Sequence, residues 1–196
     1  MFFVCINKIL AQIAFIASRF YPRHMNELDE IWSQMLEKAI AGSEAAGRGD
    51  VADYLRLKVT NDAIRRQSVE WLFDSMIEIV AEADLEFVRF SVERVEPHNF
   101  AFHGANMTGS LLRIRQGVRC LTLEAGWTRT PSDGFMRGGA LAHARITHFG
   151  IPRENRDLVL IRGNDLPEWY EAEKRGTADI FSSDDLRRHF AVFKGY

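Results

Sequence analysis

Arginine, threonine and glutamate side chains recur in the middle of the sequence at a spacing that suits chemistry on an anion. Arg113 and Arg115 alternate with apolar residues in one segment, and Thr122 and Glu124 do so in the next. On neighbouring β-strands all four would point to the same face. Guanidinium groups bind oxyanions through paired hydrogen bonds, and Glu124 would orient one of them or act as a base. The alternative is a ladder of cross-strand ion pairs on a solvated face. If the four side chains line a pocket, the anion site is favoured, and if they face bulk water, the ion-pair ladder is favoured.

Histidines supply further candidate acids and bases in the same part of the chain. They are His98, His103, His143 and His148. Imidazole exchanges a proton near neutral pH, so His103 or His143 beside Glu124 would give acid–base catalysis. His143 and His148 are five residues apart, which places them on opposite faces of a strand and about 140° apart on a helix. We therefore expect no metal site here.

Residues 126–139 combine glycines, hydroxyls, arginines and aromatic rings. Trp127, Arg129 and Arg137 are the candidate ligand-binding side chains of this stretch. Glycines allow a ligand to approach the backbone, and aromatic rings stack on bases. The alternative is that the glycines at both ends only permit a sharp bend or a bulge in one hairpin.

Residues 104–110 have the glycine spacing of a phosphate-binding loop without its chemistry. The lysine that reaches the phosphates is missing, and the segment leads into a strand rather than a helix. We expect a flexible loop that joins two strands. The sequence also lacks nucleophile-elbow, zinc-protease, dinucleotide-binding and kinase motifs, so it predicts no cofactor.

The elements that would position these residues begin with two helices. Apolar residues recur at helical spacing over residues 26–46, and Asn26 followed by acidic residues is typical of a helix N-terminus. A glycine-rich turn then leads to a second helix over residues 50–84, with a break near residues 60–62. Two antiparallel helices forming a hairpin are the simplest arrangement.

From residue 85 the apolar period changes from 3.6 to 2 residues, which is typical of β-strands. Short turns separate the alternating runs, so we expect a curved antiparallel sheet of about five or six strands within residues 85–162. One of these strands is predicted over residues 135–149. Residues 163–196 return to helix, first over residues 168–174 and then over 184–193.

This order of elements predicts one α+β domain over residues 25–196, helical over 25–84 and again over 163–196. Residues 1–24 precede it and show an amphipathic pattern, with Lys8, Gln12 and Arg19 on one side of a helix. Three interpretations of this segment stay open. It is a helix that packs on the domain or a partner, an interfacial membrane helix, or a leader that folding does not need.

Composition and charge narrow the class of protein. The chain has 196 residues, of which 46% are hydrophobic and 27% charged, which excludes disordered and collagen-like classes. Residues 25–84 carry 13 acidic and 6 basic side chains, and residues 85–150 carry 5 and 8. This basic excess is smaller than a dedicated duplex-DNA binder usually has. Cys5 and Cys120 are too distant in sequence for a CxxC pair, so we expect a cytoplasmic protein. Residues 1–24 are too short and too polar for a membrane span, so we do not expect a membrane partner.

Three hypotheses of different classes follow. The first is an accessory or binding module that recognises an anionic ligand, nucleic acid included, through a basic sheet. Its acidic helices, residues 26–84, would bind a protein partner or a second copy. The second is a small hydrolase or phosphodiester-cleaving enzyme that uses Glu124, a histidine and the arginines Arg113, Arg115 and Arg129. The third is a structural subunit whose N-terminal helix completes the core of another protein.

Overall fold

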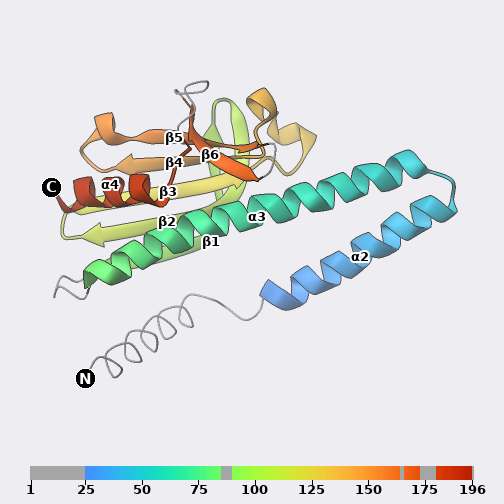
Figure 1. The fold of residues 1–196 in the computed structure, drawn as a ribbon, viewed down its shortest axis with the longest axis horizontal. Coiled ribbons are helices and arrows are strands. Elements are labelled where there is room, and N and C mark those ends of the chain that lie inside the picture. Colours follow the sequence, from blue (N-terminus) through green and yellow to red (C-terminus); the bar gives the residue numbers. More distant parts are fainter. Residues whose placement is uncertain (1–24, 85–89, 164–165, 173–179, 196) are drawn as a thin grey trace. The chain divides into compact units, whose positions relative to one another are not determined.

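The computed structural model describes residues 25–84, 90–163, 166–172 and 180–195 (Figure 1). The elements in chain order are α2 (Met25–Ala45), α3 (Gly49–Asp84), β1 (Ser91–Phe102), β2 (Ala105–Gln116), β3 (Arg119–Trp127), η1 (Pro131–Asp133), η2 (Arg137–Gly139), β4 (Ala142–His148), η3 (Pro152–Glu154), β5 (Arg156–Arg162), β6 (Pro167–Glu171) and α4 (Ser183–Lys194). The predicted α+β class is confirmed, because a helical pair precedes an antiparallel sheet and a helix follows it. The segment 1–24 lies outside the described residues.

The chain divides into two compact units, residues 1–62 and 63–196, and α3 contributes to both. In the first unit α2 ends at a glycine turn. Gly47 has a φ of 68°, and the amide of Arg48 donates to the carbonyl of Ser43 at 2.9 Å. Across the turn, the Arg56 guanidinium binds the carboxylate of Glu44. These contacts close the hairpin.

The long helix α3 continues through residues 60–62, so the predicted break there is wrong. The Thr60 hydroxyl donates to the carbonyl of Arg56 at 3.0 Å, and Lys58 pairs with Asp62 one turn further on at 3.8 Å. The polar residues that suggested a break instead bond within the helix.

The first unit leaves large apolar side chains in solvent. The exposed fractions are 54% for Ile31, 58% for Met35, 64% for Tyr54 and 51% for Leu57. Ile31 and Met35 lie on α2, and the other two on the first part of α3. The two helices of the hairpin therefore do not bury these side chains against each other.

In the second unit, six antiparallel strands pair in sequence order from β1 to β6. β1 and β6 are the two edges, so the sheet as a whole is open rather than curved as predicted, and only the outer end of the β1–β2 hairpin bends over one face. Alternation identifies the two faces of a strand, but it does not determine how strongly neighbouring strands twist.

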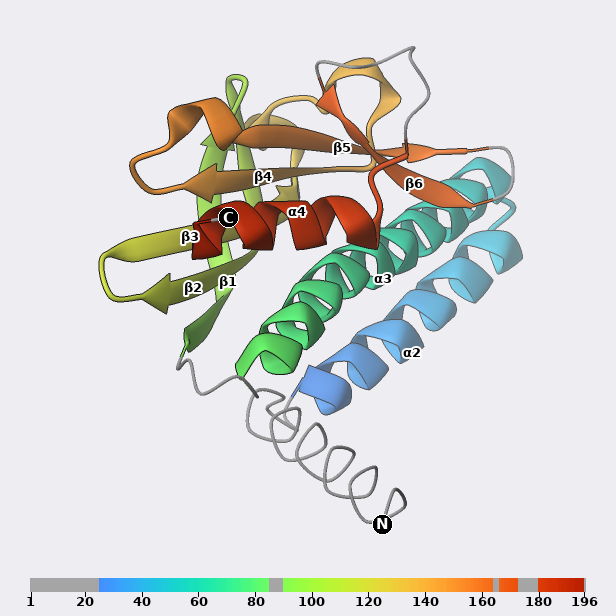
Figure 2. The same cartoon turned by 60° about the vertical axis from the view of Figure 1, so that its left-hand side comes forward.

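The sheet has two unlike faces. The covered face packs against the second part of α3 and against α4, both of which lie on the same side of the sheet (Figure 2). Its fully buried strand residues include Leu112, Ile114, Leu121, Leu123, Ile146, Leu158 and Leu160. Burying one such side chain contributes about 1.5–3 kcal/mol, so this face holds the unit together. The opposite face, here called the polar face, carries Arg113, Thr122, Glu124, Arg145 and Thr147.

Two further local predictions, for residues 104–110 and 168–174, are wrong. Residues 104–110 are not a loop, because His103 and Gly104 form a tight turn with φ values of 48° and 85°, and β2 begins directly at Ala105. Residues 167–171 form β6 rather than the start of a helix. Pro167 is compatible with the first position of an edge strand, and the Trp169 ring is buried on the covered face.

The strand predicted over residues 135–149 is shorter than expected. Only Ala142–His148 is extended, as β4, and the preceding residues form the short turns η1 and η2. Within η1, the Asp133 carboxylate accepts the amide of Thr130 at 2.8 Å, and this bond contributes to holding the pKa of Asp133 below its usual value. The β3–β4 connection is thus structured by its own polar groups.

The outer end of the β1–β2 hairpin folds across the polar face. In a flat sheet β1 and β4 would lie about 14 Å apart, which is three strand spacings. The ring of Phe102, the last residue of β1, nevertheless stacks on His143 of β4 with centroids 4.5 Å apart. Figures 1 and 2 both show this hairpin end rising beside β4 and β5.

Two glycines face each other on β2 and β3 near the point where the hairpin bends. Gly109 of β2 is paired with Gly126 of β3. A Cβ atom on Gly109 would overlap the carbonyl oxygen of Ala125 and lie 2.5 Å from the Cα atom of Gly126. The β1–β2 register also shifts between Val95 and His98, as at a β-bulge. The backbones approach closely here because neither glycine carries a side chain.

Replacing Gly109 with alanine is therefore expected to destabilise the second unit by about 3 kcal/mol, near the upper end for overpacking. Urea denaturation followed by circular dichroism measures this. Gly42→Ala is the control, because it adds a Cβ in α2 where no atom lies within 4 Å, and it should be neutral or stabilising by up to about 1 kcal/mol. Equal stability of Gly109→Ala and the native protein would contradict the close backbone approach.

Candidate functional site

Glu124 is the centre of a charged network on the polar face. Its side chain, on β3, is 19% exposed. Oε2 lies 3.1 Å from Nε2 of His98 on β1, and Oε1 lies 3.6 Å from Nη1 of Arg145 on β4. One carboxylate therefore contacts an imidazole and a guanidinium.

The network continues from Arg145 to a second carboxylate. Nε of Arg145 donates to Oδ1 of Asp157 on β5 at 2.8 Å. Oδ2 of Asp157 lies 3.6 Å from Nε2 of His103 in the β1–β2 turn. We call these five residues, His98, Glu124, Arg145, Asp157 and His103, the acid–base network. Two histidine–carboxylate pairs share one arginine.

Strand register accounts for the middle of this network. Glu124 pairs directly with Arg145, and Arg145 pairs directly with Asp157, on three neighbouring strands. Opposite charges at directly facing positions stabilise an antiparallel sheet. His98 reaches Glu124 just after the register shift in β1, and His103 reaches Asp157 because the hairpin end folds over.

A small apolar cluster lies beneath the folded hairpin end. Phe102, Ala105 and Met107 are buried together, with Met136 packed against them. The Arg145 guanidinium carbon lies 4.9 Å from the centroid of the Phe102 ring. This ring excludes water from one side of the guanidinium and so strengthens its interactions with both carboxylates.

The protonation of the histidines sets the net charge of the network. With both imidazoles neutral, two carboxylates and one guanidinium sum to −1, and with both protonated the sum is +1. Paired general base and general acid catalysis needs two proton-carrying groups, and the network contains two imidazoles.

The predicted polar-face residues lie as the alternation of the strands indicates. Arg113 pairs with Thr122 in register, and Arg115 lies two residues away on the same face of β2. Nη1 of Arg113 lies 2.7 Å from Oε2 of Glu93, so part of the predicted ion-pair ladder is present. Arg115 is exposed, and within the described part of the chain it makes no ion pair.

The two predicted catalytic histidines have different environments. His143 is 5% exposed and is covered by the stacked Phe102 ring, so a substrate cannot reach it without moving Phe102. The His103 side chain is 55% exposed and pairs with Asp157 rather than with Glu124.

The predicted ligand-binding residues of the 126–139 stretch lie elsewhere. Trp127 is 4% exposed on the covered face, with the Arg129 guanidinium 4.1 Å from its ring centroid. Trp127 is seven residues along β3 from Cys120, the partner of Arg115, which is about 23 Å of strand. The side chain of Arg137 lies outside the described residues. The structure therefore does not bring Trp127 and Arg129 together with Arg115.

Sequence reasoning missed Arg145 and Asp157, and it named His98 as a candidate acid or base without placing it beside Glu124. Arg145 and Asp157 each occupy a polar position in an alternating segment, which is the signal that could have indicated them. Their meeting with Glu124 depends on strand register, which alternation leaves undetermined.

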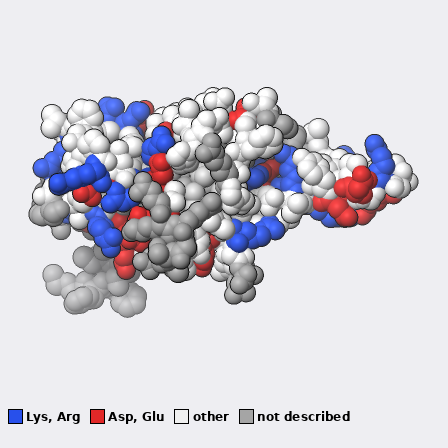
Figure 3. All heavy atoms as spheres, turned by 90° about the horizontal axis from the view of Figure 1, so that it is seen from above, with Lys and Arg blue, Asp and Glu red and all other residues white. Residues whose placement is uncertain are grey.

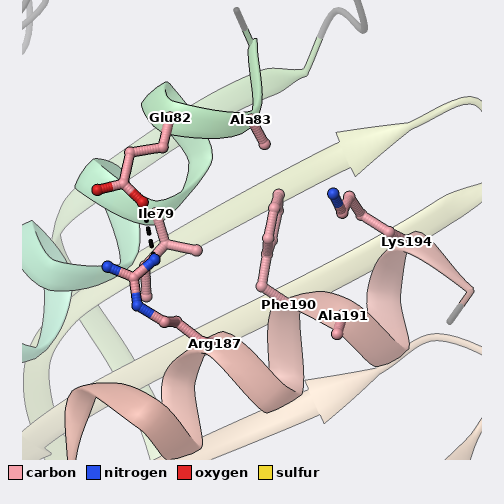
Figure 4. Close-up of a pocket in the computed structure, with 7 residues that line it drawn as sticks. All are labelled: Ile79, Glu82, Ala83, Arg187, Phe190, Ala191 and Lys194. Atoms are coloured by element: carbon pink, nitrogen blue, oxygen red, sulfur yellow. Dashed lines mark hydrogen bonds and ion pairs between the residues drawn. The ribbon is translucent and has the colours of Figure 1, made fainter. Parts of the chain in front are cut away.

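A groove of about 320 Å³ lies between α3 and α4, away from this network. Figure 4 shows its lining residues, which are Ile79, Glu82, Ala83, Arg187, Phe190, Ala191 and Lys194. The Glu82–Arg187 ion pair, 2.7 Å between Oε2 and Nη1, spans one side of it. The lining contains no histidine.

Figure 3 shows basic and acidic side chains interleaved on the face in view, rather than one continuous basic surface. Among the described residues, no group of three or more histidine, cysteine or acidic side chains could hold a metal ion. No helix within the described ranges has the length and apolar character needed to cross a membrane.

A second histidine pair is buried on the covered face. Nε2 of His148 lies 2.9 Å from Nδ1 of His189 on α4, and the residues are 4% and 8% exposed. Burial lowers the pKa of His148. Burial first, and then the neighbouring His148 and Arg156, lower the pKa of His189 to about 4, although Asp185 opposes this. Both rings are neutral at pH 7, and one donates a hydrogen bond to the other.

Comparison with known proteins gives no relative. No protein family model matches the sequence, and neither a curated protein nor a solved structure is significantly similar to it.

The buried pair predicts loss of stability in mild acid. A histidine whose pKa is lowered on folding stabilises the protein above its unfolded pKa of about 6.5, and this contribution falls as pH decreases below that value. For His189 the loss between pH 7 and pH 5 is about 2 kcal/mol. Urea denaturation at both pH values measures it, and His189→Leu should show a smaller difference. If His189→Leu lost as much stability between pH 7 and pH 5 as the native protein, a buried neutral His189 would be contradicted.

Proposed function

We propose that this chain is a binding module for a nucleic acid strand, and that the phosphates bind on the polar face beside Arg113 and Arg115. The observation that carries the proposal is the exposed Arg115 guanidinium, which makes no ion pair within the described residues. A guanidinium without a counterion offers all its donors to a phosphate.

The surroundings of Arg115 support a row of phosphate contacts. Arg113 and Arg115 are two residues apart on β2, so their Cα atoms lie about 7 Å apart along the strand. Arg113 is bound to Glu93, whose side chain is 52% exposed, so this ion pair can yield to a phosphate at small cost. Thr122, the register partner of Arg113, adds a hydroxyl.

The interleaved basic and acidic side chains on the face in Figure 3 favour a short contact over a long, continuously basic groove. Only two arginines are placed to bind phosphates in this row, so affinity should be modest and sensitive to salt. Basic side chains that follow the backbone are one of the two features by which proteins bind single strands.

Replacing Arg115 with glutamine is expected to weaken binding of a fluorescein-labelled single-stranded oligonucleotide about tenfold at low salt, because one charge-assisted contact is lost. Fluorescence anisotropy between 50 and 300 mM salt measures this, and the slope of log affinity against log salt should fall by about 0.7. Arg162→Gln removes an exposed arginine at the end of β5 and is the matched control. Native binding that does not weaken with salt would refute phosphate recognition.

The helical hairpin supports a second part of the proposal, self-association with a second copy of the chain. Ile31 and Met35 on α2 and Tyr54 and Leu57 on α3 are exposed apolar side chains. Two hairpins related by a twofold axis would form four helices, an arrangement that buries such side chains. Residues 25–62 carry eight acidic and four basic side chains, so the two copies repel each other electrostatically.

Self-association should therefore strengthen with salt, the reverse of oligonucleotide binding, because salt screens the repulsion. Light scattering of the full chain is expected to report a dimer at 300 mM salt, and Met35→Glu should shift it toward monomer. Gln34→Glu adds the same single negative charge at an exposed polar position on the same helix and is the matched control. A native monomer at every salt concentration would refute this part of the proposal.

A further inference from the structure

We infer that the acid–base network cleaves RNA by transferring the phosphorus of a phosphodiester to the adjacent 2′-hydroxyl. The inference rests on the proposed binding of a nucleic acid strand and adds a reaction to it. It is carried by the convergence of two histidine–carboxylate pairs on one arginine, through contacts of 3.1, 3.6, 2.8 and 3.6 Å.

The location of the network suits a strand held by the two arginines. Along β2 the polar-face positions run from Arg115 to Arg113 to Leu111, and Leu111 is the register partner of Glu124. Glu124 is thus one polar-face position beyond the row of Arg113 and Thr122, about 7 Å further along the strands. Phosphates bound at Arg115 and Arg113 would place a following phosphodiester at the network.

His98 has the arrangement of a general base. If Nε2–H of His98 donates to Oε2 of Glu124, the neutral ring carries its lone pair on Nδ1. Nδ1 would accept the proton of the 2′-hydroxyl as the 2′-oxygen attacks phosphorus. Glu124 is then a positioning residue, because it fixes the tautomer of His98 and stabilises the imidazolium that forms.

His103 has the arrangement of a general acid. When protonated it forms an ion pair with Asp157, and its side chain is 55% exposed, so it can meet a bound strand. As the bond from phosphorus to the 5′-oxygen breaks, the His103 imidazolium gives its proton to that oxygen. The products are a 2′,3′-cyclic phosphate and a free 5′-hydroxyl, and proton exchange with water restores both histidines.

Arg145 would stabilise the charge that develops on the phosphoryl oxygens. Only its Nε forms a hydrogen bond to Asp157, and the 3.6 Å between its Nη1 and Glu124 is an ion pair longer than a hydrogen bond. N–H groups of the guanidinium therefore stay available for the phosphate. Because Phe102 covers one side of this guanidinium, water competes less for those groups.

The test uses the full chain and a single-stranded DNA oligonucleotide that contains one ribonucleotide between a fluorophore and a quencher. The expected result is cleavage at the ribonucleotide only, with a cyclic phosphate seen by mass spectrometry. An all-DNA oligonucleotide should bind and stay intact. Cleavage of the all-DNA oligonucleotide would overturn the inference. Binding of the chimeric oligonucleotide without cleavage would also overturn it, but the proposal that the chain binds a nucleic acid strand would stand.

Variants separate the network from a contaminating ribonuclease. His98→Asn and His103→Asn should each reduce the cleavage rate at least 100-fold, with His98→Gln as a second variant if His98→Asn does not fold. Glu124→Gln should reduce the rate less and displace the pH profile. Glu171→Gln is the matched control, since this strand glutamate is 15% exposed and paired with Arg156 on the covered face. Equal rates in the native protein and His98→Asn would overturn the inference, and absent binding would refute both proposals.

Discussion

The close approach of Gly109 and Gly126 is the constraint on which the polar face depends. A Cβ on Gly109 would overlap the backbone of β3, so any other residue would force β2 and β3 apart at this level. Beyond the glycine pair the β1–β2 hairpin folds over and carries Phe102 to β4. Without that fold, His103 would lie at the far end of a flat hairpin, and Asp157 would face solvent on β5, four strand spacings from β1. The glycines thus connect backbone geometry to the chemistry of the site.

The two faces of the sheet use histidine in opposite ways. On the covered face, His148 and His189 are removed from water, and their lowered pKa values keep both rings neutral, so they act as small polar members of a core. On the polar face, His98 and His103 stay partly exposed and each lies beside a carboxylate. The difference follows from burial and from the nearest charge, since the residue type is the same.

The sequence was sufficient for the parts of the fold that local periodicity determines. Helical spacing predicted α2, and strict alternation placed Arg113 and Glu124 on one face of neighbouring strands. It was insufficient where two segments must meet. Glu124 pairs with Arg145 across the β3–β4 connection. The turns of this connection are held by local contacts, such as the hydrogen bond from the Thr130 amide to the Asp133 carboxylate. The apolar periodicity of the sequence gives no information about such contacts. The folded hairpin end depends on a glycine contact between two strands, which composition alone does not show.

Proton NMR of the full chain tests the folded hairpin end most directly. The expected result is nuclear Overhauser contacts between the Phe102 ring and the His143 imidazole, with the Arg145 methylene protons shifted upfield by the same ring. Contacts between Leu112 and Leu123 report separately that β2 and β3 are paired. The contrary result is the Leu112–Leu123 contact without any contact from Phe102 to β4. The sheet would then be present with its polar face uncovered, and the two histidine–carboxylate pairs would not share Arg145.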